Sequence, residues 1–392
     1  MTMNDLTGAD FTSVPFSAPV PVLAVGGDIK SSVCLMAGAR AAVEEIPGGL
    51  SDPAMFRAFL RAVDRTARVM DAAPERVACD MHPQYLSTRH ARGLGLPVTE
   101  VQHHHAHIMS CLVDNGVIQP VIGICCDGTG FGTDGAVWGC EVLVCGGAAF
   151  TRAGHLGYFS LPGGDAAALD TWRPAAGLLH ETYGPGWPDI AAPLLTSVDA
   201  EAVRVTAQRL AGPAALVRTS SLGRLFDGVA FLLGLCDRNR TEGEAPMAVE
   251  AAGEAWAGAV DPLPYSLGED PATGALRMDV HPMIRALVEG RGSGRSVSEL
   301  ARAFHETVAA ALAACVARTA AETGIRTAAL SGGCFFNRIL SRRLVALLQE
   351  KKLDILMHRR LSPGDGGIAL GQAAVAALEA KGGESDVSCC SR

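Results

Sequence analysis

The segment "PVIGICCDGTGFGTDGAVWGCEVLV", Pro120 to Val144, indicates the fold most directly. Its apolar run Val121–Cys126 predicts a buried strand, and Ala136–Val144 predicts the strand that returns beside it. The turn between them, "DGTGFGTDG", has the flexible backbone and orientable N–H groups that a phosphate-binding loop needs. No GK[ST] follows, so the turn is not a Walker motif, and a plain hairpin turn is the commoner structure for such a stretch.

Two further segments extend this α/β pattern. "PVLAVGGDIKSSVCLM" has apolar runs at Pro21–Val25 and Val33–Met36 around a polar tip, which predicts a second hairpin. Near the C-terminus, strand Thr327–Leu330, the turn "SGGCFFN", helix Asn337–Gln349 and strand Leu353–Met357 predict a βαβ unit. We therefore expect two α/β lobes whose loops meet in a cleft at the strand ends, where open α/β sheets bind ligands.

Helix signals and composition shifts suggest how the chain is divided. Asp52 and Pro53 begin a helix that runs to Met70, and a Ser296/Glu299 capping box begins a long one. We predict a loose leader over 1–17 and an N-terminal lobe over 18–215, with an irregular inserted region at about 146–215. A C-terminal lobe over 216–380 and a loose tail over 381–392 complete the expected organisation.

Composition excludes several classes of protein. The net charge of −8 argues against a general nucleic-acid binder, because no basic stripe neutralises phosphates. No uncharged apolar run reaches the roughly 18 residues of a membrane span, and the acidic N-terminus is not a secretory signal. The 12 cysteines include no CxxC pair. Several of them lie in apolar runs, as reduced buried thiols of a cytoplasmic protein do.

The segment "VQHHHAHIMS", Val101 to Ser110, holds four histidines. His103 and His107 are four residues apart, so on a helix they share one face and can meet at one ion. The alternatives are a solvated turn or a core-packed pair, since helical pairs at this spacing often arise by chance. Asp127 and Asp365 are candidate further ligands, because each precedes a glycine that lets the backbone approach a ligand. Two histidines with carboxylates suit zinc or iron(II).

Two glycine-containing turns are candidates for holding a nucleotide. The candidate residues are Gly128, Thr129 and Gly130 in the first turn and Gly332, Gly333 and Asn337 in the second. The second turn joins a strand to a helix N-terminus, a common place for an anion or a ribose. Asn337 can offer its amide to adenine or ribose, or it can cap the helix.

Polar residues beside or near glycine or proline give three candidates for catalysis. These are Lys30, Asp165 and Arg173, although a solvated loop position is the commoner role for such residues.

Eight motifs occur together and in a fixed order: "CDMHPQYLSTRHA", "VQHHHAHIMSCLVDNG", "CDGTGFGTDGAVWGCEV", "FSLPGGDAAALDTWRPA", "TSSLGRLFDGVAFLLGL", "EGEAPMAVEAA", "LSGGCFFNRIL" and "LSPGDGGIALGQA". From about Val22 to Ala377 the chain closely resembles the carbamoyltransferase HypF family of [NiFe]-hydrogenase maturation. It is more weakly similar to antibiotic O-carbamoyltransferases and tRNA threonylcarbamoyl-transferases. The resemblance implies a two-lobed fold of the actin/Hsp70/sugar-kinase (ASKHA) type, with a metal on His103, His107, Asp127 and Asp365.

The resemblance also implies a reaction. The family passes the carbamoyl group of carbamoyladenylate to the C-terminal cysteine of HypE, the precursor of the hydrogenase cyanide ligands. The expected cofactors are a zinc or iron ion and a Mg²⁺ that accompanies the nucleotide. Carbamoyl phosphate and ATP would be consumed upstream by a YrdC-like and an acylphosphatase unit. This chain departs from the family at "SSVCLM", where "KNTFCL" is usual, and at Cys334.

Two other functions fit the same motifs. The chain could be an O-carbamoyltransferase of a small hydroxylated metabolite, which the motifs separate poorly from the HypF reaction. It could also be a non-catalytic subunit that docks HypE or a YrdC-like protein, although the intact metal and glycine motifs argue against decay.

Overall fold

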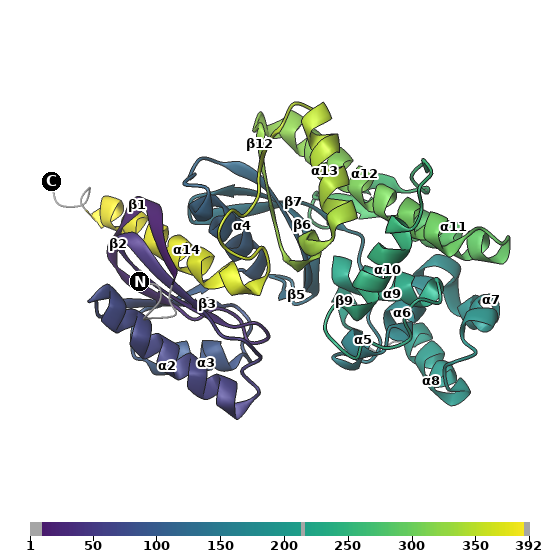
Figure 1. Cartoon of the computed structure of the whole chain (residues 1–392), viewed down its shortest axis with the longest axis horizontal. Coiled ribbons are helices and arrows are strands. Elements are labelled where there is room, and N and C mark those ends of the chain that lie inside the picture. Colours follow the sequence, from purple (N-terminus) through teal and green to yellow (C-terminus); the bar gives the residue numbers. More distant parts are fainter. Residues whose placement is uncertain (1–9, 213–215, 388–392) are drawn as a thin grey trace.

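The computed structural model describes residues 10–212 and 216–387, and two β-sheets divide them into two lobes (Figure 1). The smaller sheet has the strand order β2-β1-β3-β4, with bounds β1 Asp10–Ala24, β2 Ser32–Glu45, β3 Arg76–Asp80 and β4 Val98–Val101. Strands β1 and β2 pair antiparallel, as the predicted hairpin requires, and β3 and β4 add in parallel.

Helices cover both faces of the smaller sheet. On the outer face lie α2 (Pro53–Met70), which Asp52 caps as predicted, and α3 (Leu86–Gly93). On the inner face lie α4 (His103–Asp114) and α14 (Ile368–Val387), which share one apolar core with both sheets. The two lobes are therefore joined by a layer of two helices that lie about 250 residues apart in the sequence.

The larger sheet contains strands from both halves of the chain. Its order is β10-β11-β7-β6-β5-β12-β13, with β8 and β9 at its side. The bounds are β5 Val121–Phe131, β6 Val137–Gly146, β7 Ala149–Leu156, β8 Phe159–Ser160, β9 Arg218–Thr219, β10 Ser266–Glu269, β11 Leu276–Asp279, β12 Thr327–Ser331 and β13 Asp354–Leu356. Central β5 pairs antiparallel with β6, which confirms the predicted hairpin, and parallel with β12.

Strand β5 is buried on both faces, which explains its unbroken apolar sequence. Ile122 and Ile124 face the helices of the larger lobe, whereas Cys125 faces α4 and α14. A Cβ on Gly123 would lie 2.5 Å from a side-chain carbon of Ile108, so glycine here lets α4 pack closely on the strand. This contact sets α4 against the strand that continues into the glycine-rich turn.

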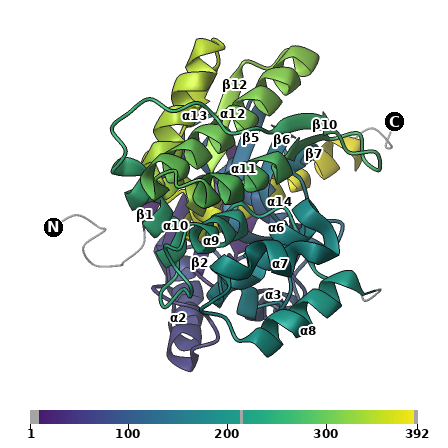
Figure 2. The ribbon, with the colours of Figure 1, turned by 90° about the vertical axis from the view of Figure 1, so that its right-hand side faces the viewer.

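The remaining helices cover the outer face of the larger sheet (Figure 2). They are α5 Ala166–Leu169, α6 Trp172–Tyr183, α7 Trp187–Ala191, α8 Ala200–Ala211, α9 Leu222–Leu232, α10 Glu244–Glu254, α11 His281–Gly292, α12 Val297–Thr323 and α13 Arg338–Glu350, with 3₁₀ turns η1 Gly184–Gly186, η2 Ala192–Leu194 and η3 Gly333–Phe336. A fourth 3₁₀ turn, η4 Asp365–Gly367, instead contacts β2, α4 and α14. Helix α12 is long and apolar enough to cross a membrane, but 78% of its most apolar window is buried, as in a core helix.

The structure corrects the expected division of the chain. The boundary placed near residue 215 falls inside the larger lobe, because β5, β6 and β7 share a sheet with β12. The region 146–215, expected to be irregular, carries strand β7 and four helices that pack around buried tryptophans such as Trp187.

The expected loose ends are also shorter than predicted. Strand β1 begins at Asp10, inside the predicted leader, and α14 runs to Val387, inside the predicted tail. The rest of both segments, 1–9 and 388–392, lies outside the described residues.

Candidate metal centre and adjoining cavity

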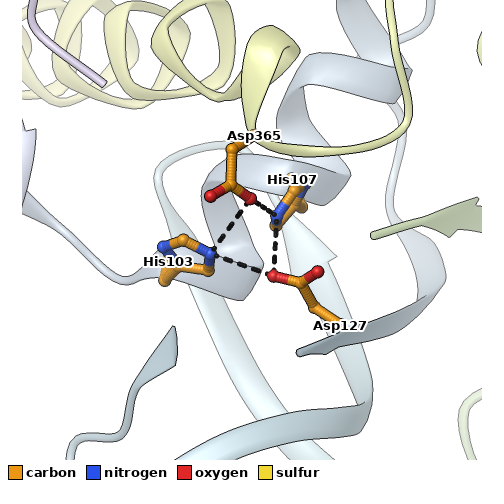
Figure 3. A group of neighbouring side chains, drawn as sticks. All are labelled: His103, His107, Asp127 and Asp365. Atoms are coloured by element: carbon orange, nitrogen blue, oxygen red, sulfur yellow. Dashed lines mark hydrogen bonds and ion pairs between the residues drawn. The ribbon is translucent and has the colours of Figure 1, made fainter. Parts of the chain in front are cut away.

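Four side chains from three separate segments converge where the lobes meet (Figure 3). His103 and His107 project from the same face of α4, Asp127 comes from β5, and Asp365 begins η4. Helix α14 packs directly on α4, because a Cβ on Gly371 would collide with the Ala106 carbonyl oxygen. This packing brings Asp365 close to the two histidines. The sequence prediction that these four residues form one group agrees with this arrangement.

The distances within the group fit a four-coordinate ion. Nε2 of His103 lies 3.4 Å from Asp127 Oδ2 and 3.8 Å from Asp365 Oδ1, and Nε2 of His107 lies 3.6 and 3.4 Å from the same two oxygens. A tetrahedral ion with bonds of about 2.0–2.1 Å separates its ligand atoms by about 3.3 Å. Within the described residues, His107 Nε2 is buried and has no hydrogen-bond partner, as expected for an atom that binds an ion. The four residues therefore fit the metal that the sequence suggests.

Asp80 is a site residue that the sequence reasoning missed. It ends β3 with no exposed surface, and its Oδ2 lies 2.7 Å from His103 Nδ1. Such a carboxylate fixes the tautomer and ring orientation of a metal-binding histidine and leaves Nε2 free for the ion. The sequence signal for Asp80 was an acidic residue at the end of a predicted strand. In the structure, the backbone N–H of His82 also donates to Asp80 Oδ1.

Electrostatics couple the histidines to the carboxylates. Burial alone would lower the pKa of His103, but hydrogen bonds to Asp127 and Asp80 raise it well above its usual value. The pKa of His107 is also raised, because Asp127 and Asp365 outweigh its burial. The histidines in turn hold the pKa of Asp127 well below its usual range against the effect of burial. A positive charge is thus favoured at this point, and a divalent ion can replace the protons.

The other two histidines do not contribute to the cluster. His104 Nδ1 lies 3.1 Å from the amide nitrogen of Gln102, the residue that caps α4, and its ring packs near Trp138. His105 packs against Phe150. Burial lowers the pKa of His104 well below its usual value and lowers that of His105 to about 4. Both are therefore neutral packing residues at physiological pH.

A cavity of about 390 Å³ opens beside Asp127 and Asp365. Its wall includes Ile29 and Lys30 from the β1–β2 tip, Gly128 and Thr129, Gly223, Arg224 and Phe226 of α9, Glu242 and Gly243, Pro246, Met247 and Glu250 of α10, Gly333, Cys334, Phe336 and Asn337, and Gly364. The cavity thus lies between the lobes, as the sequence predicts, and it is large enough for a small-molecule ligand.

Comparison with known proteins identifies the family. A family model described as "HypF Kae1-like domain" matches residues 17–114, and one described as "Carbamoyltransferase, Kae1-like Domain, second subdomain" matches residues 123–372. The "Carbamoyltransferase HypF homolog" of Cupriavidus necator is 37% identical over 365 residues, which cover 92% of each chain. The chain belongs to the HypF carbamoyltransferase family.

Other relatives are longer. "Carbamoyltransferase HypF2" of Cupriavidus necator is 40% identical, and the match covers 91% of this chain and 46% of that protein. The chain therefore spans about half the length of that HypF relative. A crystal structure of full-length HypF in the phosphate- and nucleotide-bound form matches with a TM-score of 0.88 and 34% identity, over 94% of this chain and 47% of that chain. The HypF of T. kodakarensis matches with a TM-score of 0.85 and 26% identity, over 95% of this chain and 49% of that chain. The expected two-lobed α/β fold is confirmed.

The structure divides the predicted nucleotide-binding residues of this HypF family member into two groups. Gly128, Thr129 and Gly333 line the cavity. Gly130 and Gly332 do not: a Cβ on Gly130 would lie 2.4 Å from His104 Cε1, and one on Gly332 would lie 2.2 Å from the Cys126 carbonyl oxygen. These two glycines allow close packing behind the cavity.

Asn337 lines the cavity, but its side chain is already engaged. Its Oδ1 accepts from the Leu340 N–H as an N-cap, and its Nδ2 lies 2.9 Å from His305 Nε2. The capping alternative therefore describes Asn337 better than recognition of a base.

The three candidate catalytic residues also separate. Lys30 lines the cavity, and its Nζ lies 3.0 Å from Glu242 of the larger lobe. Burial would lower the pKa of Lys30, but Glu242 raises it, so the amine is charged. Asp165 is exposed at the start of α5, and Arg173 pairs with Asp170 at 3.2 Å. Neither is among the residues that line the cavity.

Proposed function

We propose that this chain transfers the carbamoyl group of carbamoyladenylate to the C-terminal cysteine thiol of HypE, a step in cyanide-ligand synthesis for [NiFe]-hydrogenases. The observation that carries the proposal is the joining of the His103, His107, Asp127 and Asp365 cluster to a cavity with glycine-rich walls. Membership of the HypF family supplies the type of group transferred.

The side chains around the cluster support this chemistry. When bound, a zinc or iron ion supplies Lewis-acid stabilisation of the charge that develops on a carbamoyl or phosphate oxygen. Asp80 fixes the ring of His103, and the Gly333 N–H donates to Asp127 Oδ1 at 3.1 Å, which leaves Asp127 Oδ2 facing the histidines. These contacts hold the ligands in place before substrate arrives, which reduces the reorganisation needed during transfer.

The attacking thiol comes from the acceptor in this proposal. Cys334 lies on the cavity wall, but burial raises its pKa well above the usual value, so it is a neutral thiol. A neutral thiol is a poor nucleophile. The thiolate of HypE attacks the carbamoyl carbon, the bond from that carbon to the phosphate oxygen breaks, and AMP leaves.

We propose that YrdC-like and acylphosphatase units make carbamoyladenylate from carbamoyl phosphate and ATP, and that Mg²⁺ accompanies the nucleotide. We also propose that the carbamoyl transfer takes place in the cytoplasm. The paired His and Asp ligands suit zinc or iron(II), and metal analysis of the purified protein distinguishes these two ions.

The test is to mix the metal-loaded chain with preformed carbamoyladenylate and HypE, and to measure the mass of HypE. We expect HypE to gain one carbamoyl group at its C-terminal cysteine, and a His107→Ala variant to lose this activity. Absence of transfer with preformed donor contradicts the proposal. Full activity of His107→Ala would show that the metal cluster is not required.

A further inference from the structure

Arg224 lines the cavity, and its guanidinium group pairs with a buried carboxylate of the same helix. It lies in the first turn of α9, its side chain is 16% exposed, and its Nη2 lies 2.9 Å from Asp227 Oδ2. Asp227 has no exposed surface, so this is a largely buried ion pair on one helix face. Asp227 Oδ2 has no hydrogen-bond partner within the described residues, so the contact is a charge pair that keeps the guanidinium beside this carboxylate.

A second layer of contacts holds Asp227. The Nδ2 of Asn239 donates to Asp227 Oδ1 at 3.0 Å, and Asn239 Oδ1 accepts from the Ala245 N–H at 2.8 Å. Ala245 belongs to the first turn of α10, which forms another wall of the cavity. The series of contacts from Arg224 through Asp227 and Asn239 therefore connects α9 to α10 beside the cavity.

The guanidinium of Arg224 retains unused donors. Its Nε is buried and has no hydrogen-bond partner within the described residues. An unsatisfied buried donor on a charged group is costly, and a bound anion removes that cost. A guanidinium can present two parallel N–H groups to a phosphate.

The glycine-rich turn lies directly against Arg224. A Cβ on Gly128 would lie 4.0 Å from Arg224 Nη2, and a Cβ on Gly223 would lie 2.7 Å from Gly128 Cα. Ser221, the N-cap of α9, places its Oγ 2.7 Å from the Gly128 carbonyl oxygen. The N-terminus of α9 and the turn that follows Asp127 therefore form one rigid wall.

The charges around the cavity single out Arg224 as an anion ligand. Among the described lining residues, Lys30 and Arg224 are the cations, whereas Asp127, Asp365, Glu242 and Glu250 are acidic. Lys30 is 53% exposed and pairs with Glu242 across the opening. Arg224 is thus the cation that is mostly buried and held beside a buried carboxylate.

We propose that Arg224 binds the phosphate group of a nucleoside monophosphate moiety in the cavity, and that Asp227 and Asn239 are positioning residues for it. Identification of that moiety as the adenylate of the carbamoyl donor rests on the proposed function. Arg224 and Gly128 then hold the phosphate at the cavity wall while Asp127 and Asp365 face the transferred group.

The test measures the binding of AMP and of adenosine to the full chain by calorimetry. We expect Arg224→Lys and the charge-balanced double variant Arg224→Gln/Asp227→Asn to bind AMP at least about tenfold more weakly, the size of one charge-assisted hydrogen bond. Adenosine affinity should change by less than about threefold, since it lacks the phosphate. Asp227→Asn should weaken AMP binding in the same selective way but less strongly.

The control is Arg204→Gln, which removes another helical Arg–carboxylate pair at the same sequence separation, with Glu201 outside the cavity. Equal losses for AMP and adenosine in the Arg224 variants would indicate a structural role and overturn the inference. Unchanged AMP binding, or a wild-type chain that does not prefer AMP to adenosine, would overturn it as well. HypE is absent from this assay, so selective AMP binding without carbamoyl transfer would count against the proposed function alone.

Discussion

Replacement of Asp80 by asparagine tests the metal centre without touching a ligand. The Asp80 carboxylate lies 2.7 Å from His103 Nδ1, and both side chains are buried. Solvent therefore cannot compensate for the charge that Asp80→Asn removes beside His103. Loss of such an outer partner costs roughly 10–100-fold in metal affinity. We therefore expect zinc binding to weaken by about 1.4–2.7 kcal/mol in Asp80→Asn.

The pH dependence adds a second readout. Asp80 raises the pKa of His103, so in the wild-type chain protons compete with the ion as pH falls through that raised value. Without Asp80 the pKa of His103 falls, and the loss of zinc binding on acidification should move to lower pH. Competition with a chromophoric chelator at several pH values measures both effects.

Asp114→Asn is the matched control for Asp80→Asn. Asp114 is buried at the other end of α4 and accepts hydrogen bonds from the backbone N–H groups of Arg359 and Arg360, whereas its side chain pairs with none of the four candidate ligands among the described residues. Asp114→Asn should lower the free energy of unfolding but leave the zinc affinity unchanged. Wild-type zinc affinity in Asp80→Asn, or an equal loss in Asp114→Asn, would refute the reasoning.

Three other perturbations have defined outcomes. Gly130→Ala should lower zinc affinity at least about tenfold, because its Cβ would lie 2.8 Å from His103 Cδ2. Gly268→Ala should not, since no atom of the described part of the chain lies within 4 Å of a Cβ there. Burial lowers the pKa of His305 to about 4, so between about pH 4 and 6.5 the unfolded chain binds more protons than the folded chain. The free energy of unfolding therefore falls on acidification through this range, by up to about 3 kcal/mol from this residue. Denaturant unfolding at pH 5 and 7 should therefore show a smaller difference for His305→Gln, and an unchanged difference would contradict the assignment. Ser221→Ala should cost about 1 kcal/mol of unfolding free energy and weaken AMP binding, whereas loss of the α2 cap in Asp52→Ala should cost a similar amount with AMP binding intact.

Local sequence patterns predicted individual elements well. The hairpins at β1–β2 and β5–β6, the caps of α2 and α12, and the βαβ unit around α13 follow from periodicity and from residues with strong positional preferences. The pairing of β5 with β12 could not be predicted, because about 200 residues separate them and parallel pairing leaves no local signal. That pairing moved the lobe boundary away from residue 215.

The candidate site shows the same division. His103 and His107 were apparent from their spacing, and the glycines after Asp127 and Asp365 marked those carboxylates. Asp165 and Arg173 had similar local surroundings but lie outside the cavity, whereas Asp80 and Arg224 had weak local signals but belong to the site. Polar residues beside glycine are common in loops, so their neighbours in sequence cannot tell which of them face a ligand.

The sequence by itself determined the ligand types, the helical face that carries two of them and the strand that carries Asp127. Periodicity, capping and glycine placement act over a few residues, and these properties depend on nothing further away. Only the tertiary structure decided that α14 packs on α4 and carries Asp365 to the histidines, and that α9 aims Arg224 at the glycine-rich turn. Those contacts depend on burial and pairing between segments about 100 to 250 residues apart, where the free energy comes from packing of the whole chain.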